Sequence, residues 1–257
     1  MPLTPREMDY KAEEYWEGRL KANFSLSATG HSGFSLRYNR YMYKLKSGKL
    51  TQALTRHNIN VKGARVLDIG CGTGFFVEYY LNKGARAVVG IDITDVSVDL
   101  LSKEFPGQHF YRLDISKGQY SGADKFDIIN VFDVLYHIVD DGDFKSAIKN
   151  MAISARAGTW IFITDSLRPG LSGASHVRYR GLDNYRDILA QEGIDIVEVI
   201  PVLNLLGRPP VYCFHDTILE KILARLVELN RFFAYLADSL YCPFESAIMK
   251  LLICRKR

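Results

Sequence analysis

Cysteine is scarce in this 257-residue sequence, and none of its four cysteines forms a CxxC pair. The four positions are Cys71, Cys213, Cys242 and Cys254. Zinc sites and disulfide frameworks rely on closely spaced, repeated cysteines, so the sequence indicates neither kind of site. We expect free thiols.

Long hydrophobic runs are also absent: no apolar stretch approaches the roughly 18 residues that a membrane-spanning helix needs. The first ten residues are polar and lack the apolar core of a signal peptide. We therefore expect a cytoplasmic protein without a transmembrane segment.

Charge of one sign is limited as well. The formal net charge is +4, and part of it lies in Arg255, Lys256 and Arg257 at the end of the chain. A nucleic-acid-binding domain of this size usually carries a denser basic stripe. The composition therefore weighs against a nucleic-acid partner, and the length allows one large domain with a sizeable core.

Short apolar runs alternate with amphipathic stretches between residues 61 and 165. This alternation is typical of βαβ units with a parallel sheet, and nearly continuous apolar strands indicate helices on both faces. The predicted strands of this segment are Ala64–Ile69, Ala87–Ile93, His109–Leu113, Phe126–Phe132 and Trp160–Thr164.

The flanking segments are predicted to be mainly helical. Helices are expected at about 5–21, 36–57 and 182–192, with a loop from Ser25 to Gly33. Strands are expected at 194–203 and 248–254. Between these last strands, apolar residues from Ile218 to Leu240 recur every three or four positions, which predicts a helical insertion at about 210–245.

A glycine-rich turn follows the first predicted strand: Asp68-Ile69-Gly70-Cys71-Gly72-Thr73-Gly74. Glycine permits a tight turn and close approach to a ligand, and the helix that follows offers free N–H groups. The dinucleotide pattern GxGxxG fails here because Phe75 occupies the position of its third glycine. Asp68 would also repel a pyrophosphate but suits a cationic ligand.

The turn resembles motif I of the class I S-adenosylmethionine-dependent methyltransferases, Asp/Glu-x-Gly-x-Gly-x-Gly. The resemblance implies a Rossmann-like α/β fold with a seven-stranded, mostly parallel sheet whose last strand is antiparallel. We expect residues 1–60 to form an N-terminal helical lid and residues 61–257 to form the core with its insertion. S-adenosyl-L-methionine would be the cofactor.

By this resemblance, acids at successive strand ends would anchor the methyl donor. Asp92 would accept both ribose hydroxyls, and Asp114 would accept a hydrogen bond from the adenine amino group. The complete predicted set of cofactor-binding residues is Asp68, Gly70, Cys71, Gly72, Gly74, Asp92, Ile93, Leu113, Asp114, Ile115, Phe132 and Val134.

The segment after the fourth strand, Asp133-Val134-Leu135-Tyr136-His137-Ile138, resembles that of small-molecule methyltransferases. His137 would lie near the transferred methyl group, where a histidine suits the removal of a proton from a hydroxyl acceptor. A purely structural role for His137 is the alternative. The other predicted substrate-binding residues are Tyr38, Tyr41, His176 and Arg178.

The acceptor is inferred mainly from absent motifs. No Asp/Asn-Pro-Pro-Tyr/Phe motif follows strand four, and no Pro-Cys nucleophile lies there, so DNA and RNA acceptors are disfavoured. Asp140, Asp141 and Asp143 suit a helix N-terminus better than a metal site. We expect O-methylation of a natural product, sugar or lipid intermediate; a protein or RNA acceptor, or a non-catalytic cofactor-binding subunit, are the alternatives.

The helical insertion has three candidate roles: a roof over the acceptor pocket, a homodimer interface, or contact with a membrane surface. Its acids Asp216, Glu220 and Glu228 weigh against binding to anionic lipid.

Overall fold

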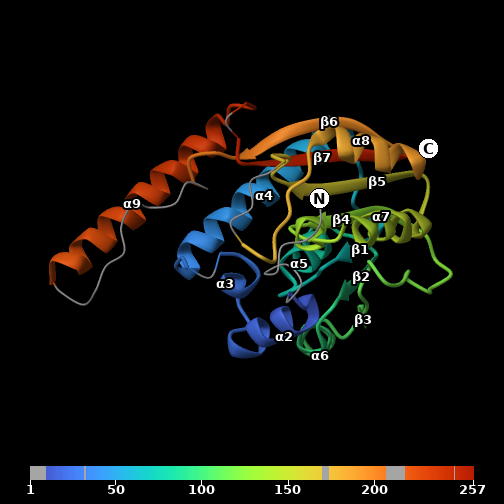
Figure 1. Ribbon diagram of the computed structural model, residues 1–257, viewed down its shortest axis with the longest axis horizontal. Coiled ribbons are helices and arrows are strands. Elements are labelled where there is room, and N and C mark those ends of the chain that lie inside the picture. The colour runs from blue at the N-terminus through green and yellow to red at the C-terminus, as the bar shows by residue number, and fades with distance from the viewer. Residues whose placement is uncertain (1–9, 32, 170–173, 207–217, 246) are drawn as a thin grey trace.

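The computed structural model describes residues 10–31, 33–169, 174–206, 218–245 and 247–257, with only the helical backbone for 218–228. A seven-stranded sheet in the order β3-β2-β1-β4-β5-β7-β6 runs through the domain (Figure 1). Neighbouring strands are parallel except β7, which is antiparallel to β5 and β6. The strands are β1 (Arg65–Ile69), β2 (Ala87–Asp92), β3 (His109–Arg112), β4 (Phe126–Phe132), β5 (Ala155–Asp165), β6 (Ile194–Leu203) and β7 (Met249–Lys256). The predicted topology is confirmed.

Helices cover both faces of the sheet. The side chains of a strand alternate between the two faces, and here apolar side chains point to both. Val66 packs in the core with Leu50 and Tyr80, whereas its neighbour Leu67 packs with Phe144 and other residues of the opposite core. One layer contains α4 (Leu36–Arg56), α5 (Phe75–Asn82) and α6 (Asp95–Glu104); the other contains α7 (Asp141–Ser154) and α8 (Leu182–Gln191).

The helices of the N-terminal segment lie in two different places, and only α4 belongs to the helical layer on the sheet. Helix α2 (Ala12–Ala22) contacts α6, whereas α4 packs on the sheet beside α5. The predicted loop from Ser25 to Gly33 is wrong in part, because Leu26–Thr29 form the short helix α3. The Ser25 hydroxyl accepts a hydrogen bond from the Ser27 N–H and so begins that helix. Residues 1–9, where the first predicted helix begins, lie outside the described residues.

Helix α9 (Ile218–Leu240) is the main helix of the predicted insertion; its neighbours 207–217 lie outside the described residues. It lies beside α4 and its first half extends beyond the domain (Figure 1). The buried carboxylate of Asp238 accepts the N–H groups of Asn204, Leu205 and Leu206, which fastens the end of α9 to the turn after β6. In the part of the chain described, no helix is long and apolar enough to cross a membrane.

Candidate active site

The glycine-rich turn between β1 and α5 depends on positive φ angles. Gly70, Gly72 and Gly74 have φ values of +72°, +50° and +79°, which side chains disfavour. The N–H groups of Gly70 and Cys71 donate to the Ile91 carbonyl at 2.7 and 3.1 Å, which ties the turn to β2. A Cβ atom on Gly70 would lie 2.3 Å from Cγ2 of Val134, so the turn also fits tightly against the segment after β4.

Asp92 ends β2 with its carboxylate fixed in place. Its Oδ2 accepts the Gly72 N–H at 2.8 Å, and its Oδ1 accepts the Thr94 N–H at 3.0 Å and the Thr94 hydroxyl at 2.7 Å. Burial raises the pKa of Asp92, while these donors oppose the shift. The carboxylate is therefore pre-oriented at the edge of the glycine-rich turn.

A cavity of about 730 Å³ opens where β1, β2 and β4 end. A volume of this size suits a small-molecule ligand. Eleven predicted site residues line it: Gly70, Cys71, Gly72, Asp92, Ile93, Leu113, Asp114, Ile115, Phe132, Val134 and His137. Asp114 is fixed in a similar way to Asp92, because its Oδ1 accepts the N–H and the hydroxyl of Ser116 at 2.8 and 2.7 Å.

Two residues of the predicted cofactor set, Asp68 and Gly74, do not line this cavity. Asp68 is buried behind the turn, where its Oδ1 accepts the Asn130 side-chain amide at 2.7 Å. Burial raises the pKa of Asp68 to about 7, and the nearby charge of Asp92 adds to the shift. Gly74 instead lets α5 approach α6, because a Cβ atom there would lie 2.6 Å from the Leu101 side chain.

His137 lies in the 3₁₀ helix η1 (Leu135–His137) and also lines the cavity. Its Nδ1 lies 2.8 Å from the His176 carbonyl oxygen. A carbonyl can only accept, so Nδ1 carries the proton and Nε2 keeps its lone pair. Burial lowers the pKa of His137 to about 4, and the ring is therefore neutral at neutral pH.

Helix α2 forms a wall that sequence reasoning placed only roughly. Tyr10, just before it, and Trp16 line the cavity, and the Trp16 ring meets the His137 ring edge-on with centroids 4.7 Å apart. The Glu17 carboxylate accepts the Asp95 N–H at 2.8 Å at the start of α6, and Glu13 forms an ion pair with Arg112. These contacts hold α2 across the cavity.

A buried ion pair joins Lys46 of α4 to Asp133, which lines the cavity next to His137. The Lys46 side chain is 3% exposed, and the Thr164 hydroxyl donates to Asp133 Oδ1 at 2.9 Å. Asp133 has a φ of +61°, a conformation uncommon outside glycine that often marks functional sites. This pair was not predicted from the sequence. The one hint of a buried lysine was the position of Lys46 between Tyr43 and Leu50, which are both buried.

Tyr38 and Tyr41 do not reach the cavity, contrary to expectation. The Tyr38 hydroxyl donates to the Leu206 carbonyl at 3.0 Å, and Tyr41 stacks on Tyr235 of α9. The residue of α4 that does line the cavity is Tyr43, which donates to the Thr29 hydroxyl at 2.8 Å. The helix thus turns Tyr38 and Tyr41 toward α9, and their role in substrate binding stays a prediction that this arrangement does not favour.

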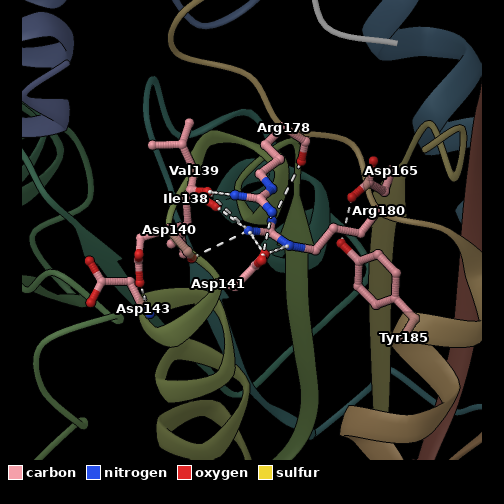
Figure 2. Close-up of polar contacts among 9 residues, drawn as sticks. All are labelled: Ile138, Val139, Asp140, Asp141, Asp143, Asp165, Arg178, Arg180 and Tyr185. Atoms are coloured by element: carbon pink, nitrogen blue, oxygen red, sulfur yellow. Dashed lines mark hydrogen bonds and ion pairs between the residues drawn. The ribbon is translucent and has the colours of Figure 1, made fainter. Parts of the chain in front are cut away.

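His176 and Arg178 are likewise displaced from the cavity wall. The His176 ring stacks on Tyr15 with centroids 4.7 Å apart, and its backbone carbonyl orients His137. Arg178 donates to Asp141 Oδ2 at 2.6 Å and to the Val139 carbonyl at 3.1 Å (Figure 2). Its guanidinium is therefore already used at the start of α7, and the contact between Arg178 and the acceptor stays a prediction that this arrangement does not favour.

Arg180 is the buried side chain that organises this region, and no feature of the sequence distinguishes it from Arg178. It donates to Asp141 and to the carbonyls of 138–140 (Figure 2). Its guanidinium also lies 3.9 Å from the centre of the Phe144 ring. Asp140 caps α7 by accepting the Asp143 N–H at 2.9 Å, as predicted. No cluster of metal-binding side chains occurs among the described residues.

Known proteins resemble the chain in both sequence and fold. The family model described as "Methyltransferase domain" matches residues 38–198. A ubiquinone biosynthesis O-methyltransferase of Coxiella burnetii is 30% identical over 109 residues, covering 41% of this chain and 45% of that one. An mRNA cap guanine-N(7) methyltransferase of Caenorhabditis briggsae is 30% identical over 130 residues, covering 44% and 34%.

Among solved structures, magnesium protoporphyrin IX methyltransferase from Synechocystis PCC 6803, with bound S-adenosylhomocysteine, superposes with a TM-score of 0.61 at 17% identity. The match covers 95% of this chain and 98% of that one. The chain spans less than half the length of the two sequence relatives. The family match covers more than half of the chain and includes the glycine-rich turn and both anchored acids. The chain therefore belongs to the family that this methyltransferase-domain model describes.

Proposed function

We propose that the enzyme methylates a hydroxyl group of a small molecule, with His137 as the base. The observation that carries this proposal is the neutral His137 ring at the cavity wall, held by the His176 carbonyl with its Nε2 lone pair unused by that contact. A hydroxyl becomes a better nucleophile as its proton is removed, and a positioned neutral histidine is suited to that step.

The residues present fit S-adenosylmethionine in the part of the cavity that the glycine-rich turn lines. Glycines keep side chains out of the turn, and Asp92 and Asp114 are held by neighbouring donors with their carboxylates at the cavity wall. Asp92 would bind the ribose hydroxyls and Asp114 the adenine amino group, while the turn would surround the methionine part. When bound, the cofactor supplies an electrophilic methyl group on a sulfonium.

The cover formed by α2 supports a small acceptor over a macromolecular one. Trp16 and Tyr10 stand over the cavity beside His137, and Asp133 with Lys46 closes its wall from α4. Such a cover excludes water and orients a small acceptor within reach of the base. The relative that acts in ubiquinone biosynthesis supports an oxygen acceptor, whereas the mRNA cap relative keeps RNA as the alternative to be tested.

The test compares His137→Ala with His176→Ala on a panel of phenolic and alcoholic acceptors, with capped RNA as a separate arm. Loss of the base should lower kcat by about a hundredfold or more while donor affinity, measured by calorimetry, stays unchanged. His176→Ala keeps the backbone carbonyl that holds His137, so its kcat should change only a few-fold.

The pH dependence adds an independent readout. Because the pKa of His137 is about 4, the base is unprotonated at neutral pH, and kcat should fall only as the pH drops toward that value. Equal kcat for His137→Ala and the parent enzyme, or methylation confined to capped RNA, would overturn the proposal.

A further inference from the structure

An apolar face of α9 remains exposed on the described part of the chain. Leu229, Phe232, Phe233, Leu236 and Leu240 are between 37% and 87% exposed, and they lie within an arc of about 100° at 100° per residue. We call this set the α9 face. Isolated exposed apolar residues are ordinary, but a continuous row on one helix marks a contact surface.

Helix α4 places positive charge beside the α9 face. The two helices meet where Tyr41 approaches Phe232, with ring centroids 6.1 Å apart. α4 carries six lysine and arginine residues and no acid. Three of them, Arg37, Arg40 and Lys44, are exposed and make no ion pair with any residue that the structure describes. We call these three the α4 stripe.

The acids of this region do not neutralise the α4 stripe in the described structure. Asp238 is the single acid among the described side chains of α9, and its buried carboxylate is used by three backbone N–H groups. The acids Asp216, Glu220 and Glu228, which weighed against anionic lipid in the sequence, lie outside the described side chains. What the structure describes is an apolar face on α9 and, on the helix packed beside it, three exposed basic side chains.

We propose that the α9 face and the α4 stripe together dock the enzyme on an anionic lipid bilayer. Apolar side chains on a helix enter the boundary between headgroups and acyl chains, while lysine and arginine contact anionic headgroups. A symmetric second copy fits less well, because pairing α9 faces would bring two basic stripes close together. The inference does not depend on which molecule accepts the methyl group.

The experiment is cosedimentation of the full chain with phosphatidylcholine vesicles, either pure or containing about a third phosphatidylglycerol. Binding should be about tenfold stronger to the anionic vesicles and should weaken at high salt. Phe233→Glu with Leu240→Glu should reduce this binding about tenfold, and so should Arg37→Glu with Lys44→Glu. All four positions are exposed, so the variants should fold, which thermal unfolding will check.

The controls make changes of the same kind elsewhere: one apolar residue replaced by an acid, and two charges reversed. Val197→Glu alters an exposed apolar residue on β6, and Lys145→Glu with Lys149→Glu reverses two exposed charges on α7; both should bind within about twofold of the parent. Equal binding by control and surface variants would overturn the proposal. A chain that does not bind the vesicles would also overturn it. If that chain instead forms a concentration-dependent dimer that Leu240→Glu dissociates, the α9 face is a dimer interface.

Discussion

The two ends of the cavity are built from different parts of the chain. The proposed donor end consists of a turn and strand ends between residues 70 and 115, held by local bonds such as those of Asp92 to Gly72 and Thr94. The acceptor end joins Trp16, Lys46 and His137, which come from segments far apart in sequence. A local motif thus specifies the donor end, whereas tertiary packing specifies the acceptor end.

The sharpest test of the donor end is Gly70→Ala. The positive φ costs an alanine about 1–2 kcal/mol, and its Cβ would overlap Val134, so the turn must move away from the segment after β4. We expect donor affinity, measured by calorimetry, to fall about a hundredfold, which corresponds to about 2.7 kcal/mol. Unaltered affinity would show that the turn tolerates displacement.

Gly63→Ala is the control for this variant. Gly63 also has a positive φ, +78°, but no atom lies within 4 Å of the position its Cβ would take. The Gly63→Ala variant should lower the free energy of unfolding by about 1 kcal/mol in urea titrations without affecting donor binding. The pair of variants therefore separates backbone strain from close contact.

The next largest effect is expected for Asp92→Asn. Replacing the anchored carboxylate removes its charge from the proposed ribose contact, and hydrogen bonds to charged groups contribute about 1.5–3 kcal/mol. Donor affinity should fall about thirtyfold in calorimetric titration. Asp95→Asn, an exposed acid at the start of α6, should bind normally. If both variants lose affinity equally, the effect arises from overall charge instead of the ribose contact.

The strands could be predicted because each contains a compact apolar run, whereas the seven-stranded sheet with an antiparallel last strand was expected from the resemblance to class I methyltransferases. The predicted and observed bounds of the fourth strand, Phe126–Phe132, are identical. The short helix α3 was missed because four residues, Leu26-Ser27-Ala28-Thr29, are too few to show a helical period.

The acceptor end could not be predicted to the same depth, because a helix pattern gives spacing but not its rotation about the axis. On α4, Tyr38, Tyr41 and Tyr43 are equally plausible from sequence, and only packing against α9 turns the first two away. Lys46 and Asp133 are 87 residues apart, so no local pattern links them. Arg178 and Arg180 are also equally plausible from sequence, and only the packing shows that Arg180 lies over Phe144.

A third prediction concerns how pH affects the donor end. The pKa of Asp68 is raised to about 7, so its carboxyl is protonated below that pH and charged above it. A cationic donor is attracted to the charged form, and its affinity should therefore rise up to about tenfold as the pH increases through 7. The demethylated product has no sulfonium charge and should respond less.

Asp68→Asn tests this assignment by calorimetry with both ligands. The asparagine cannot titrate, so the difference between donor and product should become independent of pH near 7. An undiminished pH dependence in this variant would assign the titration to another group, of which Asp92 is the nearest described candidate.

The smallest predicted effect probes the cover over the cavity. Glu17 places its carboxylate at the N-terminus of α6, where a negative charge contributes about 0.3–1 kcal/mol. Glu17→Gln keeps a hydrogen-bond acceptor but removes that charge, so α2 should open more often and release product about two- to fivefold faster.

The fluorescence of Trp16 at the cavity wall gives a direct stopped-flow signal for release. Asp99→Asn on α6 removes an exposed charge that makes no ion pair with any described residue and lies outside the cavity wall, so it should leave the rate unchanged. Equal rates in the two variants would mean that α2 is held over the cavity by its aromatic contacts with His137 and His176, and that the acceptor end is closed by packing alone.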